Sequence, residues 1–522
     1  MHRDRDFSPA RESDRVAPEP RQDLALDTLW QAMAGDDDFL AGVARDAILS
    51  CTGNDADTIL YRQAALRDVL DHPDVARQLY DLAVDAIEQE KKVGFFGRVS
   101  RYPASILHSS IDVLQMFADR LRKLRDIARE QASRFESEAF VRLFAMLVDE
   151  LDDAYLARIE AHLSELRLKN GVLLSAQLGP GTASANIVLR QMGEAPRWWQ
   201  RMVDLHASAY SFHVDPRDES GAEILSHLRD RGINEVANAV AQSADHILAF
   251  FRMLRTELAF YVGGLNLHRR LAALASPLCF PQPLPVGGRR RRFRALRDAC
   301  LALEMGRDVV GNDVDADGID LVVITGANQG GKSSFLRAIG LAQLMMQCGM
   351  FVAAESFEAE LCSGLFTHYK REEDASMRSG KFDEELARMS KIADRIAPNA
   401  LLLFNESFAA TNEREGAEIA GQVVRALLEK GIKLFFVTHS YEFAHGLFER
   451  RPGNVLFLRA ERLADGTRTF SLAEGEPQET SHGEDLYRRI FGGGDPPDAT
   501  GRPAGATRTD TGHPTGQGAA HA

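Results

Sequence analysis

The sequence is poor in cysteine, and its cysteines do not form pairs. Five are scattered over 522 residues, without the short spacing that places two thiolates on one zinc ion. Scattered cysteines fit buried thiols in a reducing compartment better than a disulfide framework. We therefore expect neither a disulfide framework nor a zinc site, and no cysteine nucleophile.

The sequence also lacks a long apolar run. No stretch approaches the roughly 20 apolar residues that a membrane-spanning helix needs. The N-terminal segment MHRDRDFSPARESDR has no apolar core of the kind that a secretory signal contains. We expect a cytoplasmic protein without a membrane partner.

The sequence also has no excess of positively charged residues. The formal net charge is −14, which argues against a surface uniformly adapted to nucleic acid, although it says nothing about a local basic groove. The length allows about two to four domains, each with a sizeable core.

Composition changes along the chain and predicts its organisation. Residues 1–22 and 493–522 are rich in charged residues, Pro, Gly or Thr without periodicity, so we expect disorder there. Residues 23–285 place Leu, Ile, Val and Phe at helical spacing in long stretches, which predicts a mainly α-helical bundle or lever. Two short apolar runs around GPGTAS predict a small β-hairpin near residues 170–192.

A proline- and glycine-rich stretch ends the helical pattern and marks a domain boundary. Residues 286–294 follow and contain RRRRFR, which we interpret as a solvated basic linker, with phosphate contact as the alternative. From 295 to 492, apolar runs of buried-strand length alternate with helical patterns. This alternation predicts an α/β domain with a parallel sheet and a ligand site at the carboxyl ends of its strands.

A glycine-rich loop, GANQGGKSS, lies between a predicted strand and a predicted helix. The strand is IDLVVIT at 319–325, and the loop has the spacing G-x-x-x-x-G-K-S. In this context the glycine backbone can close around phosphates, Lys332 supplies a positive charge, and Ser333 can hold Mg²⁺. A chance glycine turn is the alternative. The predicted phosphate-binding residues are Gly326, Ala327, Asn328, Gln329, Gly330, Gly331, Lys332, Ser333 and Ser334.

Polar residues end two further predicted strands. The strand ALLLFNES, expected beside the loop's own strand, ends in Asn405 and Glu406. Asn405 can hold a metal-bound water, and Glu406 can orient the attacking water. A polar strand end without a catalytic role is the alternative. The strand IKLFFVTHS presents His439, which can sense a γ-phosphate or be merely structural.

A helix is predicted to begin near SGKFDEELARM. Ser379 precedes a glycine at the N-terminus of this helix. That position suits either an anion-binding site or an ordinary helix cap.

Together these segments resemble the ATPase domain of the MutS DNA mismatch-repair family. The resemblance rests on ITGANQGGKSSFLRAIGLAQLMMQCGMFVAAESF, on the later motifs in the family's order, and on a final TSHGEDLYRRIFG. The segment VVGNDV resembles the one near the adenine and carries Asn312 and Asp313. A weaker resemblance to the family's core and lever domains extends it to residues 25–492.

The resemblance implies an α/β P-loop ATPase domain of the ABC type that uses ATP and Mg²⁺. It also implies a homodimer in which Ser379 reaches the partner's nucleotide and helical arms embrace DNA. Asn405 stands where the family usually has aspartate, and the chain has no room for the mismatch-recognition or connector domain.

Two main interpretations remain. The first is an ATP-driven DNA clamp, for which LRKLRDIAREQASR, residues 121–134, is the best basic stripe. The second is an ATP-dependent switch that binds a protein and hydrolyses little. A small-molecule kinase is a distant third.

Overall fold

The computed structural model describes residues 2–7, 19–94, 102–169, 171–182, 184–190, 213–215, 217–371, 380–450, 453–463 and 467–478. All of these lie in one compact unit, residues 1–478. Within these ranges no helix combines the length and the hydropathy that crossing a bilayer requires. The expectations for Ser379, TSHGEDLYRRIFG and the C-terminal tail concern residues outside the described part.

The N-terminal half is helical, as the apolar spacing predicts. Side chains of Asp or Ser cap the starts of five of its helices, α4, α5, α9, α10 and α12, by accepting a backbone N–H. The helices are α2 (Glu19–Asp23), α3 (Leu26–Ala34), α4 (Asp38–Leu49), α5 (Ala56–Asp71), α6 (Pro73–Val93), α8 (Pro103–Gln131), α9 (Glu138–Glu150), α10 (Asp153–Leu166) and α12 (Glu219–Ala273).

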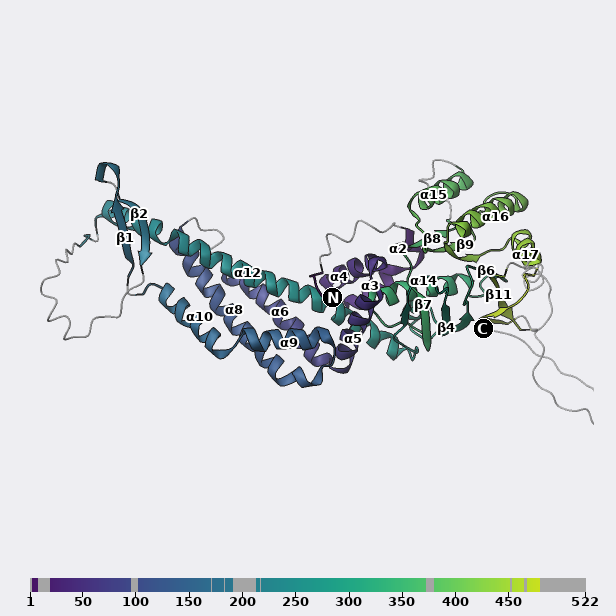
Figure 1. Ribbon diagram of the computed structural model, residues 1–522, viewed down its shortest axis with the longest axis horizontal. Coiled ribbons are helices and arrows are strands. Elements are labelled where there is room, and N and C mark those ends of the chain that lie inside the picture. The colour runs from purple at the N-terminus through teal and green to yellow at the C-terminus, as the bar shows by residue number, and fades with distance from the viewer. Residues whose placement is uncertain are drawn as a thin grey trace, which may run out of the picture. The chain divides into compact units, whose positions relative to one another are not determined.

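Helix α12 organises this half. It has 55 residues and runs alongside α6 and α8, with α3 and α4 also against it (Figure 1). Phe251, Leu254 and Leu258 recur at helical spacing on its buried face. The ring of Phe251 stacks on Phe117 of α8 with centroids 5.4 Å apart. This apolar stripe forms the core of the helical half.

The predicted hairpin is present. Strand β1 (Leu173–Leu178) pairs antiparallel with β2 (Ser184–Arg190), and β2 contacts α12. This antiparallel pairing agrees with the hairpin predicted near residues 170–192.

The C-terminal half contains a six-stranded sheet in the order β12-β11-β6-β10-β9-β8. All neighbours are parallel except β11 and β12. The strands are β6 (Leu321–Thr325), β8 (Leu365–Tyr369), β9 (Leu401–Asn405), β10 (Lys433–Val437), β11 (Val455–Arg462) and β12 (Arg468–Glu474).

Alternate strand residues face opposite sides of this sheet. Val322 and Ile324 belong to a core shared with α14 (Lys332–Cys348), whereas Leu321 and Val323 belong to a second core. That second core is built with α15 (Lys381–Arg395), α16 (Glu413–Glu429) and α17 (Tyr441–Arg450). Helices therefore cover both faces, which explains why the strands are continuous apolar runs.

A second sheet has four strands in the order β3-β7-β4-β5. They are β3 (Gln282–Leu284), β4 (Arg291–Leu296), β5 (Asn312–Asp315) and β7 (Ser356–Glu360), with α13 (Ala299–Met305) between β4 and β5 in the chain. Phe293 of β4 stacks on Phe357 of β7 at 5.7 Å and contacts Phe335 of α14 at 5.9 Å. These ring contacts pack the second sheet against α14.

The arginine run belongs to this sheet and is not the solvated linker expected for 286–294. Strand alternation buries Arg291, whose guanidinium donates to Gln343 at 3.1 Å. Its neighbours pair with acidic residues: Arg290 and Arg292 both contact Asp317. Asp315 at the end of β5, and Asp317 and Asp320 after it, are the acidic partners that an interpretation of the arginine run alone did not consider.

The N-terminal segment also differs from the expected disorder of residues 1–22. Glu19–Asp23 forms α2, which contacts β8. Phe7 is buried, and its backbone N–H donates to Glu257 of α12 at 2.8 Å. Long-range contacts, which leave no local pattern, order these residues.

Candidate functional site

The glycine loop follows the fully buried strand β6 and leads into α14. Gly326 has φ +116°, and a Cβ there would lie 2.9 Å from both the Cβ and the backbone nitrogen of Ala460 on β11. Only glycine fits this backbone conformation and this close approach without strain. The strand, loop and helix predicted for 319–348 are confirmed.

Lys332 is the first residue of α14 and turns back into the loop. Its ammonium donates to the carbonyl oxygens of Gly326 and Ala327 at 2.7 and 2.8 Å. Burial lowers the pKa of Lys332 to about 8, while the charge of Glu406 acts in the opposite direction. The ammonium is therefore mostly protonated at neutral pH and lies inside the loop.

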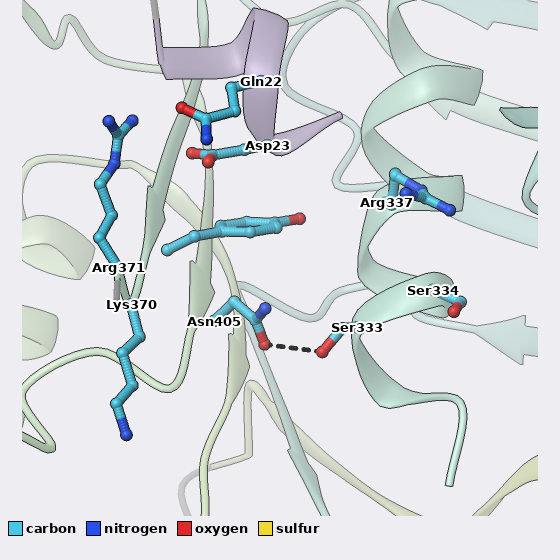
Figure 2. Close-up of a pocket in the computed structure, with 9 residues that line it drawn as sticks. Gln22, Asp23, Ser333, Ser334, Arg337, Lys370, Arg371 and Asn405 are labelled. Atoms are coloured by element: carbon cyan, nitrogen blue, oxygen red, sulfur yellow. Dashed lines mark hydrogen bonds between the residues drawn. The ribbon is translucent and has the colours of Figure 1, made fainter. Parts of the chain in front are cut away.

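Ser333 and Asn405 meet at the predicted metal position. The Ser333 hydroxyl donates to Asn405 Oδ1 at 3.1 Å (Figure 2). Both groups are neutral. Among the described residues no cluster of three or more His, Cys, Asp or Glu side chains is arranged to hold a metal. The structure thus joins the two residues predicted for Mg²⁺, but as a hydrogen-bonded pair without a carboxylate.

Glu406 and His439 form the second polar pair. His439 Nε2 and Glu406 Oε1 are 2.7 Å apart. This hydrogen bond lowers the pKa of the Glu406 carboxyl against the effect of its partial burial, and the charges of His439, Lys332 and Lys370 act in the same direction as the hydrogen bond. Glu406 is therefore ionised at neutral pH and held in place by His439.

The sheet brings these residues together in an order that differs from the prediction. Strand β10 lies between β6 and β9, so β6 and β9 do not pair with each other. His439 follows β10, and Glu406 follows β9. The parallel register still gathers the carboxyl ends: Val437 of β10 pairs with both Ile324 and Asn405. The expected common edge is confirmed, whereas direct neighbourhood of β6 and β9 is wrong.

A cavity of about 600 Å³ opens beside Ser333 and Asn405 (Figure 2). Sequence reasoning missed most of its wall, because α2 and the end of β8 come from distant segments. The sequence did contain a signal for two of these residues, because Lys370 and Arg371 directly follow the strand-length run LFTHY. The cavity is lined by Gln22, Asp23, Ser333, Ser334, Arg337, Tyr369, Lys370, Arg371 and Asn405.

A second cavity, of about 310 Å³, also borders the N-terminal end of α14 and is mainly apolar. Gly331, Ser334 and Asn312 line it together with side chains of α13, α14 and β12. The amide oxygen of Asn312 accepts a hydrogen bond from the backbone N–H of Leu472 at 2.7 Å. Asn312 therefore holds β12 against the cavity wall and does not have its amide oxygen free.

The remaining predicted residues are placed in different ways. Gln329 accepts a hydrogen bond from Arg468 of β12 at 2.6 Å, while Ala327, Asn328 and Gly330 complete the loop. Ser379 lies outside the described residues. Helix α15 begins at Lys381 after Gly380, with no side chain capping it.

The basic stripe predicted on the helical half is largely compensated by acids. Arg122 pairs with Glu160, and both Arg125 and Arg129 pair with Asp153, at 2.5 and 3.6 Å. Arginines held by neighbouring carboxylates offer little net positive charge to a phosphate backbone. This arrangement weakens the case for the stripe as a DNA-binding surface.

Comparisons with protein families match both halves. Residues 54–274 match the MutS2 N-terminal domain, and residues 322–472 match MutS domain V. The chain belongs to the MutS family. The second match contains the loop, Asn405, Glu406 and His439, so the site assembled above lies within a MutS domain.

Individual relatives match only part of this MutS-family chain, and at low sequence identity. The DNA mismatch repair protein MutS of Chloroflexus aurantiacus is 27% identical over 270 residues, which cover 48% of this chain and 28% of the relative. The MutS of Thermus aquaticus is 32% identical over 186 residues, covering 36% and 22%. The endonuclease MutS2 of Thermus thermophilus is 31% identical over 179 residues, covering 34% and 23%. The chain thus spans less than a third of the length of these relatives.

Proposed function

We propose that this MutS-family chain binds and hydrolyses ATP, and that it works as a homodimeric clamp on DNA. The observation that carries the ATPase proposal is one sheet edge that holds both a phosphate-type loop with its lysine and an ionised carboxylate paired with histidine. These are the groups that positioning and activation of phosphates and water require.

In this proposal the glycine loop and Lys332 bind the phosphates. Backbone N–H groups of residues 326–331 and the start of α14 supply positive potential, and the ammonium leaves its two carbonyl partners for phosphate oxygens. The apolar cavity of about 310 Å³ next to Gly331 receives the base. Ser334 lines both this cavity and the larger one, so it lies between the base and phosphate regions.

Glu406 acts on the attacking water. Its hydrogen bond with His439 keeps the carboxylate ionised and oriented, and His439 lies at the end of the strand next to the loop. His439 thus lies where it can contact both Glu406 and a terminal phosphate. The side chains at the expected Mg²⁺ position, Ser333 and Asn405, fit that ion poorly because Mg²⁺ sites in proteins usually include a carboxylate.

The helix that starts at the phosphate loop also contacts the helical half. Near its C-terminal end, the backbone oxygens of Leu344, Gln347 and Cys348 accept hydrogen bonds from Cys51, Asn54 and Arg62 at 3.4, 2.9 and 3.3 Å. A nucleotide-driven shift of α14 would therefore reach the α5 region directly. This contact is the route by which we propose that ATP biases the helical arms.

Support for DNA as the partner comes from the relatives, which include proteins named for DNA mismatch repair. We propose a homodimer in which Ser379 approaches the partner's nucleotide, and a cytoplasmic location. The second candidate, an ATP-dependent switch that binds a protein, is favoured by one observation: Glu160 and Asp153 hold three arginines of the basic stripe.

The test is steady-state ATP hydrolysis by the purified chain, with and without duplex, branched and single-stranded DNA, at low and high salt. The clamp predicts stimulation by DNA that declines with salt, because released counterions drive the binding. ATP binding with no DNA effect on turnover at either salt concentration would contradict the clamp and favour the protein-binding switch. Absence of ATP binding would contradict both.

A further inference from the structure

The large cavity beside the phosphate loop carries an excess of positive charge. Its charged wall residues are Arg337, Lys370 and Arg371 against the single carboxylate of Asp23. Arg337 is paired with Asp298 at 2.5 Å. Lys370 and Arg371 lie on the opposite side of the cavity from Arg337 (Figure 2). The charge of Arg371 acts on the Asp23 carboxyl, so one net positive charge remains in this wall to balance an anion.

Lys370 is held next to the metal position. It directly follows β8, and its backbone N–H donates to the carbonyl oxygen of Asn405 at 2.9 Å. Its ammonium lines the cavity and forms no hydrogen bond or ion pair with another residue in the described part of the chain. The charge of Lys370 also contributes to the lowered pKa of Glu406, which places this ammonium within electrostatic reach of the catalytic edge.

Arg371 has an unused donor in the same wall. Its Nε is buried and has no hydrogen-bond partner among the described residues. The carboxylate of Asp23 accepts a hydrogen bond from Thr367 of β8 at 2.6 Å, so this acid is partly satisfied by the protein itself. A buried N–H donor without a partner costs free energy that a ligand oxygen can recover.

The metal position beside these cations lacks the charge that Mg²⁺ needs. Asn405 and Ser333 offer two neutral oxygens that already share a hydrogen bond. Glu406 is engaged with His439 and Asp23 with Thr367. This position is therefore bordered by side-chain cations and, within the described chain, has no free carboxylate to bind a metal ion. The phosphates of a nucleoside triphosphate are negatively charged, and either a metal ion or such cations can balance that charge.

We propose that Lys370, assisted by Arg371, takes over the charge-balancing role of Mg²⁺, so that this chain binds a nucleoside triphosphate without a divalent metal. The inference rests on the proposed ATP site and specifies how its phosphates are neutralised. Lys332 binds the phosphates from the loop side and Lys370 from the cavity side. Asn405 is then a matched partner of Lys370, because an aspartate there would attract the lysine and compete with the nucleotide.

The test measures the Kd of ATP for the full chain in Mg²⁺ and in excess EDTA. For the unmodified protein the two values should agree within about threefold, which is less than 1 kcal/mol. Lys370→Met should weaken binding about tenfold or more in EDTA, where no metal replaces the lost charge. Lys430→Met, at the C-terminal end of α16, removes the same charge away from the cavity and serves as the matched control. Asn405→Asp should make binding depend on Mg²⁺.

The outcomes separate this inference from the proposed function. Tight binding in Mg²⁺ that is lost in EDTA for the unmodified protein overturns metal-free binding and leaves the ATP site standing. Equal Kd values for Lys370→Met and Lys430→Met in EDTA overturn the role of Lys370. No ATP binding under either condition overturns the ATP site itself. The comparison on the unmodified protein decides the main question even if a variant fails to fold.

Discussion

Gly349 offers a sharp test of the connection between the phosphate-loop helix and the helical half. It ends α14 with φ +83°, in the left-handed region. A Cβ at this position would lie 2.4 Å from the Cβ of Arg62 and 3.1 Å from the carbonyl oxygen of Ile59, both on α5. Neither neighbour is the far end of a flexible side chain. Gly349→Ala therefore requires the two elements to move apart.

The magnitude follows from two terms. A non-glycine residue in the left-handed region costs about 1–2 kcal/mol, and overpacking at a buried contact costs about 1–3 kcal/mol. The reduced entropy of the unfolded chain returns roughly 0.4–1 kcal/mol. We expect a net loss of about 1–5 kcal/mol in the free energy of unfolding.

Urea unfolding followed by circular dichroism measures this loss, and Gly421→Ala is the matched control. Gly421 lies inside α16, has no φ in the left-handed region, and has open space where a Cβ would be added. The same change there should raise stability by about 0.5–1 kcal/mol. If Gly349→Ala unfolds at the same urea concentration as the unmodified chain or Gly421→Ala, the close packing of α14 on α5 is refuted.

Two further predictions concern the site. Glu406→Gln should retain ATP binding and lose roughly a hundredfold or more in turnover, because the amide cannot accept the water's proton. Glu418→Gln, on the exposed face of α16, is the control and should keep full turnover. Equal rates for the two variants would contradict the assignment of Glu406. ATP affinity should fall by up to about tenfold for each pH unit above 8, because Lys332, whose pKa burial lowers to about 8, is charged below that pH and neutral above it. Calorimetric titration on both sides of pH 8 measures this slope, and a flat profile through that pH would show that Lys332 does not supply the phosphate-binding charge.

Residues close in sequence allowed most of the site to be predicted. The apolar run of β6, the glycine spacing and the helical pattern of α14 are local, and they place Lys332 and Ser333 at the loop as expected. Glu406 and His439 were also predicted, since each follows a buried strand and parallel strands end at one edge. Their 2.7 Å contact, however, depends on the pairing of β9 with β10, which no local pattern indicates.

Long-range packing decided the rest. The arginine run resembled a solvated linker because its acidic partners, Asp315 at the end of β5 and Asp317 just beyond it, lie farther along the chain. Gln22 was assigned to the disordered N-terminal end because the surface that orders α2 is built from β8, far along the chain.

The sequence by itself determined the MutS-type loop, the helical half with its hairpin, and the neutral Asn405, because each depends on residue type and short-range periodicity. Only the tertiary structure decided which cations surround that asparagine, because sheet order and the docking of distant segments depend on contacts that are distributed over the whole chain.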